Sequence, residues 1–159
     1  MLLNKEQVMD FLPHREPFLF IDSLESLELP ANYPENPRTK DLVGAIITAK
    51  YSTTEDHPIF AGHFPGHPIL PGVVQIEMIA QGASFVVTKF MANPSEGKLD
   101  VALLSVSAAK FRKPIYPGMD LTIINKCEKI RGLFMTFSGA VYHNGELMSE
   151  ATVLASVKF

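Results

Sequence analysis

The segment GHFPGHPILPGVVQIEMIAQ, from Gly62 to Gln81, carries most of what the sequence predicts about this chain. It places His63 in a loop rich in glycine and proline, and it places Glu77 inside an apolar run that follows the loop. Burying a carboxylate costs free energy unless the group has a partner. An ionisable imidazole and a desolvated carboxylate are also the groups that enzymes use to move protons. The segment therefore indicates a candidate site for acid–base chemistry.

The four prolines of residues 58–71 predict a stiff loop without a regular element. A helix should follow from Gly72 to about Ala92 and end before the turn signal at residues 93–97. The helix is apolar nearly all round, which predicts burial on every side. Its polar exceptions lie at i, i+4 and i+7, and therefore on one face: Glu77, Gln81 and Ser84.

The rest of the chain reads mainly as strands. Asn4 and Gln7 have capping-box spacing, which predicts a helix over residues 5–12 that stops at Pro13. The proline-rich residues 30–40 predict a loop. Asn144-Gly145 is a strong hairpin signal, and Arg131-Gly132 closes the hairpin before it. Apolar and β-branched runs predict strands over residues 18–21, 41–53, 99–106, 121–130, 133–142 and 146–157. This order favours an α+β fold in one domain, residues 1–159, with an antiparallel sheet wrapped around one long central helix.

The bulk composition narrows the function classes. The chain has 159 residues, 47% of them hydrophobic, and a net charge of −3 without the basic clustering of a nucleic-acid binder. The single cysteine, Cys127, allows no intrachain disulfide and fits a reducing compartment or a small core residue. The N-terminus lacks the apolar core of a secretory signal. Glu77 would be costly in lipid, so the apolar helix predicts burial in protein, no membrane span and a cytoplasmic location.

Each candidate residue has a plainer interpretation beside the functional one. Glu77 could form a structural ion pair, and His63 could be an ordinary loop histidine. Gly72 could be a turn residue, or its N–H at the helix start could stabilise an oxyanion. The basic cluster of Lys110, Arg112 and Lys113 could be solvated surface charge or a docking patch for an acidic partner. A metal site would draw on His57, His63, His67 and Glu77, but no familiar zinc-ligand spacing is present.

Three blocks of the chain resemble the bacterial (3R)-hydroxyacyl-[acyl-carrier-protein] dehydratases of fatty-acid synthesis. The blocks are LPHREPFLFID at residues 12–22, the segment at residues 62–81, and KFRKPIYPG at residues 110–118. The resemblance implies a hotdog fold, a homodimer and commonly a trimer of dimers. We expect no metal, and no cofactor either, because a thioester itself acidifies the C2 position of the substrate. The resemblance also implies that His63 of one subunit and Glu77 of the other are catalytic and that the Gly72 amide binds the thioester carbonyl. Supporting roles fall to Phe64, Pro71 and Gln81, and the partner is acyl carrier protein bearing an acyl-phosphopantetheine.

The chain also departs from the family pattern. Met78, Ala102, Ser107 and Met119 stand where other residues are usual, and the loop of residues 30–40 looks longer. These departures leave open the acyl chain length and a specialised acyl or polyketide pathway. A hotdog thioesterase and a non-catalytic subunit that binds acylated carrier protein are the alternative functions.

Overall fold

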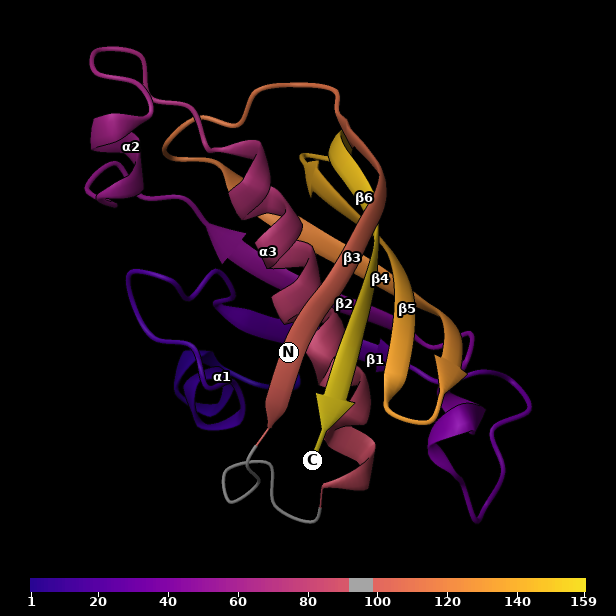
Figure 1. Ribbon diagram of the computed structural model, residues 1–159. Helices are drawn as coiled ribbons and strands as arrows, with labels where there is room; N and C mark the ends of the chain where they lie inside the picture. The colour runs from indigo at the N-terminus through magenta and orange to yellow at the C-terminus, as the bar shows by residue number, and fades with distance from the viewer. Residues whose placement is uncertain (92–98) are drawn as a thin grey trace.

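The computed structural model describes residues 1–91 and 99–159, and in them six antiparallel strands form one sheet around a central helix (Figure 1). The strand order is β1-β2-β4-β5-β6-β3. The strands are β1 (Ser23–Glu28), β2 (Ile46–Ser52), β3 (Asp100–Phe111), β4 (Asp120–Arg131), β5 (Phe134–His143) and β6 (Glu146–Lys158). The helices are α1 (Lys5–Phe11), η1 (Thr39–Leu42), α2 (Ile59–Gly62), α3 (Gly72–Ala83) and η2 (Ser84–Phe90). This architecture is the hotdog fold, which confirms the predicted fold class.

The central helix packs on the inner face of the sheet, and every second residue of the covered strands is buried against it. Strand β4 alternates buried and more accessible positions from Leu121 to Cys127, as a strand with one covered face does. Two glycines allow the close approach of α3. A Cβ atom at Gly139 of β5 would collide with Ile79 of α3, and a Cβ at Gly82 would lie 3.0 Å from the side chain of Asn125. The helix axis is therefore held close to β4 and β5.

The N-terminal helix forms as predicted. The Asn4 side chain accepts a hydrogen bond from the Gln7 N–H, and the Gln7 side chain accepts one from the Asn4 N–H, both at 3.0 Å. The Nζ of Lys5 then donates to the Ile21 carbonyl at 3.2 Å and pairs with Asp22 at 2.8 Å. These contacts fix α1 against the segment that leads into β1.

The strand predicted for residues 18–21 is wrong, and strand β1 was not predicted. Residues 18–21 are extended and largely buried, but their backbone bonds to a side chain of α3 and not to a neighbouring strand. Gln81 accepts a hydrogen bond from the Phe20 N–H at 2.8 Å and donates to the Phe18 carbonyl at 3.0 Å. The strand forms further along the chain, where Ser23–Glu28 pairs with β2.

Several other elements begin or end at residues different from those predicted. Residues 39–42 form the helical turn η1, so the strand predicted from residue 41 begins at Ile46. The prediction that residues 58–71 contain no regular element is wrong, because residues 59–62 form the one-turn helix α2. The helix that begins at Gly72 is α-helical only to Ala83 and continues as a 3₁₀ helix to Phe90. The turn predicted at residues 93–97 lies outside the described residues.

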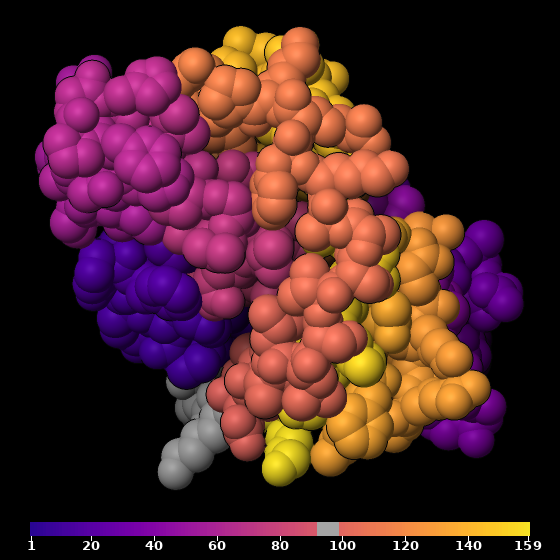
Figure 2. Space-filling view, turned by 45° about the horizontal axis from the view of Figure 1, so that its top comes forward, coloured from indigo at the N-terminus to yellow at the C-terminus, as the bar shows by residue number. Residues whose placement is uncertain are grey.

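One side of the central helix is open, contrary to the predicted burial on every side. Val73 is 74% exposed, and Gly72, Ile76 and Glu77 are only partly covered. Figure 2 shows this surface of α3 between the N-terminal segment and strand β3. Strand β3 is an edge of the sheet and exposes Leu104, Val106 and Phe111 to between 40% and 51%. Among the described residues, no helix has both the length and the apolar character needed to cross a membrane.

Candidate active site

The loop that carries His63 is held by a tight turn. The N–H and carbonyl groups of Phe64 and His67 bond to each other at 2.9 and 2.8 Å, which closes a turn with Pro65 and Gly66 in its centre. Gly66 has a φ of +73°, a value that a type II turn requires at this position and that glycine adopts without strain. The turn therefore returns the chain from His63 towards the start of α3.

Within this loop the His63 ring has a fixed orientation. Its Nδ1 lies 2.8 Å from the carbonyl oxygen of Ile69, and the Ile69 N–H donates back to the His63 carbonyl at 2.8 Å. The Phe64 ring stacks on the imidazole with centroids 4.0 Å apart. Because a carbonyl oxygen only accepts, Nδ1 must carry the proton in the neutral ring, and Nε2 then holds a free lone pair.

His63 shares a cavity of about 620 Å³ with the start of α3. Gly72 opens this helix, and Pro71 before it provides no side-chain cap. The Val74 and Gln75 N–H groups bond to the Pro71 carbonyl, whereas those of Gly72 and Val73 precede the first intrahelical bond. The Phe111 ring of β3 lies over Gly72, where a Cβ would meet it at 2.9 Å. The cavity thus combines an imidazole, free helix N–H groups and an aromatic wall.

Glu77 lies farther along α3 and is 20% exposed. Its Oε1 accepts a hydrogen bond from Gln81 Nε2 at 2.9 Å, as the i, i+4 spacing predicts. The same oxygen lies 3.3 Å from Nε2 of His14. Glu77 lines a smaller cavity of about 60 Å³ with His14, Gln81, Val101 and Leu103 among its walls. The carboxylate therefore has a basic neighbour and still borders open space.

Within the protomer, His63 and Glu77 line two different cavities. Strand β3 borders both, with Phe111 at the His63 cavity and with Val101 and Leu103 at the Glu77 cavity. Residues of α3 also line both, with Val73 and Ile76 at the His63 cavity and Ala80 at the Glu77 cavity. The chain thus presents the imidazole of His63 and the carboxylate of Glu77 in two separate cavities.

The basic cluster is largely ion-paired. Arg112 lies 3.1 Å from Glu150, and Lys113 pairs with Glu146, both acidic partners coming from β6. Arg112 and Lys113 also line the cavity that contains His63. Lys110 stands on β3, opposite Glu150 in the strand register. The cluster therefore borders the His63 cavity, but its positive charge is reduced by two carboxylates.

The residues that a metal site would draw on, His57, His63, His67 and Glu77, form no metal-binding group among the described residues. Nε2 of His57 bonds to the Pro17 carbonyl at 3.1 Å, while His63 and Glu77 have the partners described above. In the described part of the chain, no three side chains of His, Cys, Asp or Glu form a group that could hold a metal ion.

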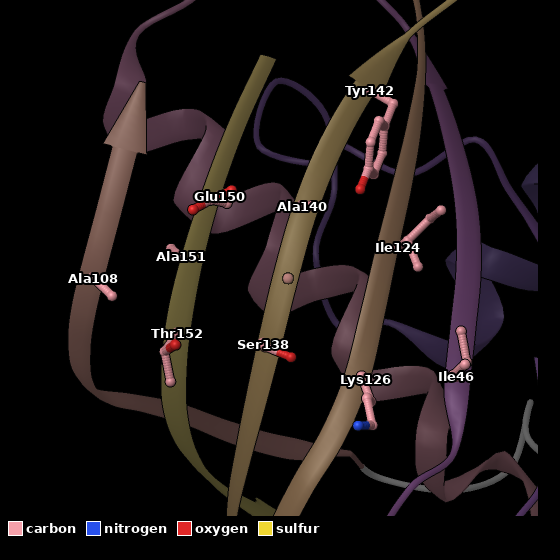
Figure 3. Close-up of a pocket in the computed structure, with 11 residues that line it drawn as sticks. Ile46, Ala108, Ile124, Lys126, Ser138, Ala140, Tyr142, Glu150, Ala151 and Thr152 are labelled. Carbon is pink, nitrogen blue, oxygen red and sulfur yellow. The ribbon is translucent and has the colours of Figure 1, made fainter. Parts of the chain in front are cut away.

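A further groove lies on the face of the sheet opposite α3 (Figure 3). It measures about 400 Å³ and is bordered by side chains such as Ile46, Ile124 and Tyr142. Lys126 and Glu150 add charge to its rim. None of the residues predicted to be catalytic lines this groove.

Sequence reasoning assigned no role to two residues that the structure places at the His63 and Glu77 cavities. His14 belongs to the LPHREPFLFID block, and its contact with Glu77 joins two positions that are far apart in the sequence. Gln75 is 3% exposed, and its Nε2 donates to the Leu70 carbonyl at 3.2 Å. The GVVQIE run places Gln75 in the predicted helix, but nothing in the sequence indicates its hydrogen bond to Leu70.

A sheet wrapped around a helix that carries acid–base groups defines the class of hotdog enzymes. A family model described as ApeI-like, ApeI dehydratase, matches residues 39–151. The chain is 35% identical to the 3-hydroxyacyl-[acyl-carrier-protein] dehydratase FabZ of Thiobacillus denitrificans, over 98% of each chain. It is 34% identical to the FabZ of Anaplasma phagocytophilum, over 98% of this chain and 97% of the relative.

Among solved structures, the dehydratase heterocomplex ApeI:P from Xenorhabdus doucetiae superimposes with a TM-score of 0.70. The match is 18% identical and covers 96% of this chain and 91% of that chain. A mutant of the fluoroacetyl-CoA-specific thioesterase FlK matches with a TM-score of 0.59 at 11% identity, over 79% of this chain and 90% of that chain. These structural matches establish the fold. The sequence matches establish more: the chain belongs to the 3-hydroxyacyl-[acyl-carrier-protein] dehydratase family, and it is a hydro-lyase by that membership.

Proposed function

We propose that the chain catalyses the reversible removal of water from a (3R)-hydroxyacyl thioester carried by acyl carrier protein, giving the trans-2-enoyl thioester, in fatty-acid biosynthesis. The C2–H and C3–OH bonds break, the C2=C3 double bond forms, and water leaves. The proposal draws on the relatives of the chain and on one geometric observation. The Ile69 carbonyl fixes the proton of the His63 ring on Nδ1, which leaves Nε2 free to act as a base.

In the proposed reaction His63 removes the proton from C2. The negative charge that develops on the thioester oxygen needs donors that are already in place. The free N–H groups at the start of α3, led by that of Gly72, border the same cavity as His63. The lack of a side chain at Gly72 allows the thioester to approach them closely.

Glu77 protonates the departing C3 hydroxyl group. Gln81 holds the carboxyl group by the bond to Oε1, which leaves Oε2 for the substrate. Because His63 and Glu77 of one protomer border different cavities, the proposed site takes its histidine from one subunit and its glutamate from the other.

The open surface of the protomer supports such a dimer. The edge strand β3 and the exposed face of α3 present Val73, Leu104 and Phe111 to solvent. An unpaired edge of this kind favours strand pairing with a second copy, and the exposed apolar side chains would be buried by it. An antiparallel arrangement of two copies would bring the His63 cavity of one against the Glu77 cavity of the other. Further association of dimers into a trimer of dimers is part of the proposal.

Acyl carrier protein would deliver the substrate at the His63 cavity. Lys110, Arg112 and Lys113 stand at or near its rim, where an anionic phosphopantetheine and an acidic carrier would be attracted. We place the enzyme in the cytoplasm, since the chain has one cysteine and that residue is buried as a free thiol.

Dehydration is tested by following the ultraviolet absorption of the conjugated enoyl product with hydroxyacyl thioesters of graded length. Each proton-transfer group typically contributes about 10²–10⁴-fold in rate, so His63→Ala and Glu77→Gln should lose activity by such factors. The matched controls are His67→Ala in the same loop and Glu6→Gln on α1, which should keep full activity. Near-normal turnover by either of the first two variants would reject the assigned roles. Release of free thiol in place of enoyl product would indicate a thioesterase.

A further inference from the structure

We propose that His14 is a positioning residue that, together with Gln81, confines the acidic proton of Glu77 to Oε2, the carboxyl oxygen left to face the substrate. This inference rests on the proposed function of Glu77. It assigns a role to a side chain that stands far from Glu77 in the sequence and meets it only in the fold.

The orientation of the Gln81 amide is fixed by the backbone of residues 18–20. Its oxygen accepts from the Phe20 N–H at 2.8 Å, and its nitrogen donates to the Phe18 carbonyl at 3.0 Å. Reversing the amide would place a donor against an N–H and an acceptor against a carbonyl oxygen. The group that contacts Glu77 Oε1 at 2.9 Å is therefore the NH₂ group, which can only donate.

The His14 ring is also restricted to one tautomer. Its Nδ1 is buried and has no hydrogen-bond partner, whereas Nε2 lies 3.3 Å from Glu77 Oε1. A proton on Nδ1 would be a buried donor without an acceptor, which is costly. The neutral ring therefore carries its proton on Nε2, the nitrogen that lies 3.3 Å from Glu77 Oε1. Nη1 of Arg15 bonds to the carbonyl oxygens of His14 and Leu12 at 2.7 and 2.9 Å and fixes this stretch of backbone.

The nitrogens of two N–H groups thus lie 2.9 and 3.3 Å from one carboxyl oxygen. A proton on Oε1 would face both of them, so a protonated Glu77 carries its proton on Oε2. When Oε2 gives the proton to the leaving hydroxyl group, the charge that develops on the carboxylate is already stabilised at Oε1. His14 does not need to touch the substrate to have this effect.

Few charged groups surround Glu77, so the effect of His14 can be tested by varying the pH. Among the side chains lining the Glu77 cavity, only Glu77 and His14 titrate, and β3 contributes the apolar Val101 and Leu103. The guanidinium group of Arg15 donates hydrogen bonds to backbone carbonyl oxygens and not to Glu77. In the dimer the partner's His63 cavity adds the other titrating group of the reaction.

The experiment compares His14→Phe, which keeps the ring shape without a donor, with His14→Gln, whose amide nitrogen can replace Nε2. A hydrogen bond to a charged group has the strength to change a rate by roughly 10- to 100-fold, so His14→Phe should lower kcat by such a factor with little change in KM. Since the lost donor stabilised the ionised carboxyl group, the limb of the pH–rate profile governed by Glu77 should move to higher pH while the other limb stays. His14→Gln should restore most of kcat and the wild-type profile. His143→Phe, at the far end of β5, is the matched control.

A second measurement does not depend on turnover. The carbon-13 signal of the Glu77 carboxyl group, followed against pH, should report protonation at higher pH in His14→Phe than in the wild type and in His14→Gln. Equal signals in all three proteins, or an equal loss of kcat in both variants with unchanged pH profiles, would overturn the role of His14. A wild-type protein that dehydrates no hydroxyacyl thioester would instead refute the proposed function, and the carboxyl titration would still decide the contact with His14.

Discussion

The two candidate proton-transfer residues are each held on one side and left open on the other. The Ile69 carbonyl fixes one nitrogen of His63, and the Gln81 amide fixes one oxygen of Glu77, which His14 Nε2 approaches to 3.3 Å. In both cases the fixing partner determines which atom remains for the substrate. Such preorganisation lowers the cost of reaching the reactive geometry, because the side chains do not need to be ordered when substrate binds.

Cys127 illustrates the opposite situation, a titratable group sealed in the core. It points inward from β4 with no exposed surface, and burial raises the pKa of its thiol to about 12. Since the thiolate is the reactive form, the folded protein should not react with a thiol reagent at pH 8. Adding denaturant should expose one reactive thiol per chain. Rapid labelling of the folded protein under these conditions would contradict the burial described here.

For individual residues, the sequence predicted the relations between positions that are close together in the chain. The spacing of Glu77 and Gln81 predicts that they share one face of a helix, and in the structure their side chains are hydrogen-bonded to each other. The contact of Glu77 with His14 depends on how the segment after α1 returns to the central helix, and no local pattern encodes that path. The catalytic roles of His63 and Glu77 themselves remain predictions from the resemblance and the chemistry.

Among the secondary-structure elements, β1 shows why a strand can go unpredicted from the sequence pattern. Its apolar residues Leu24 and Leu27 are three positions apart, a spacing that is typical of a helix. A β-bulge between Leu24 and Ser26 adds one residue, so both leucines face the core. The apolar residues 18–21 looked more like a strand, but the Gln81 side chain satisfies their backbone. The start of α3 and the Asn144-Gly145 turn were local enough to predict.

The packing of α3 on β5 yields a prediction about stability. Gly139 leaves room for Ile79 of α3, and a Cβ at this position would also collide with the Asn125 side chain. Overpacking of a core typically costs about 1–3 kcal/mol, so Gly139→Ala should lower the free energy of unfolding by that amount. Ala140→Val adds methyl groups on the opposite face of the same strand, where the groove of Figure 3 has space, and should change stability little. Urea unfolding of the two variants measures the difference, and equal stability would show that the helix and sheet are less closely packed than described.

The whole molecule presents the cavities of His63 and Glu77, the two half-sites of the proposed dimer, on one open surface. Under the proposed mechanism a single chain would therefore hold no complete proton-transfer pair. Residues of β3 and of α3 line both the cavity of His63 and the cavity of Glu77. A twofold axis across this surface would place unlike half-sites against each other twice, because a twofold interface pairs each patch with its complement in both directions. The dimer would then contain two equivalent sites.

A mixing experiment tests this arrangement. His63→Ala and Glu77→Gln proteins, each nearly inactive alone, are unfolded together in equal amounts and refolded so that mixed dimers form. In a mixed dimer one site loses both groups, while the other takes its intact histidine from one chain and its intact glutamate from the other. With random pairing about half of the dimers are mixed, so the refolded sample should recover about a quarter of wild-type activity. The same variants refolded separately and then combined, which is the control, should stay inactive until their subunits exchange. If both catalytic groups acted within one chain, no mixture could recover activity, and the shared site would be refuted.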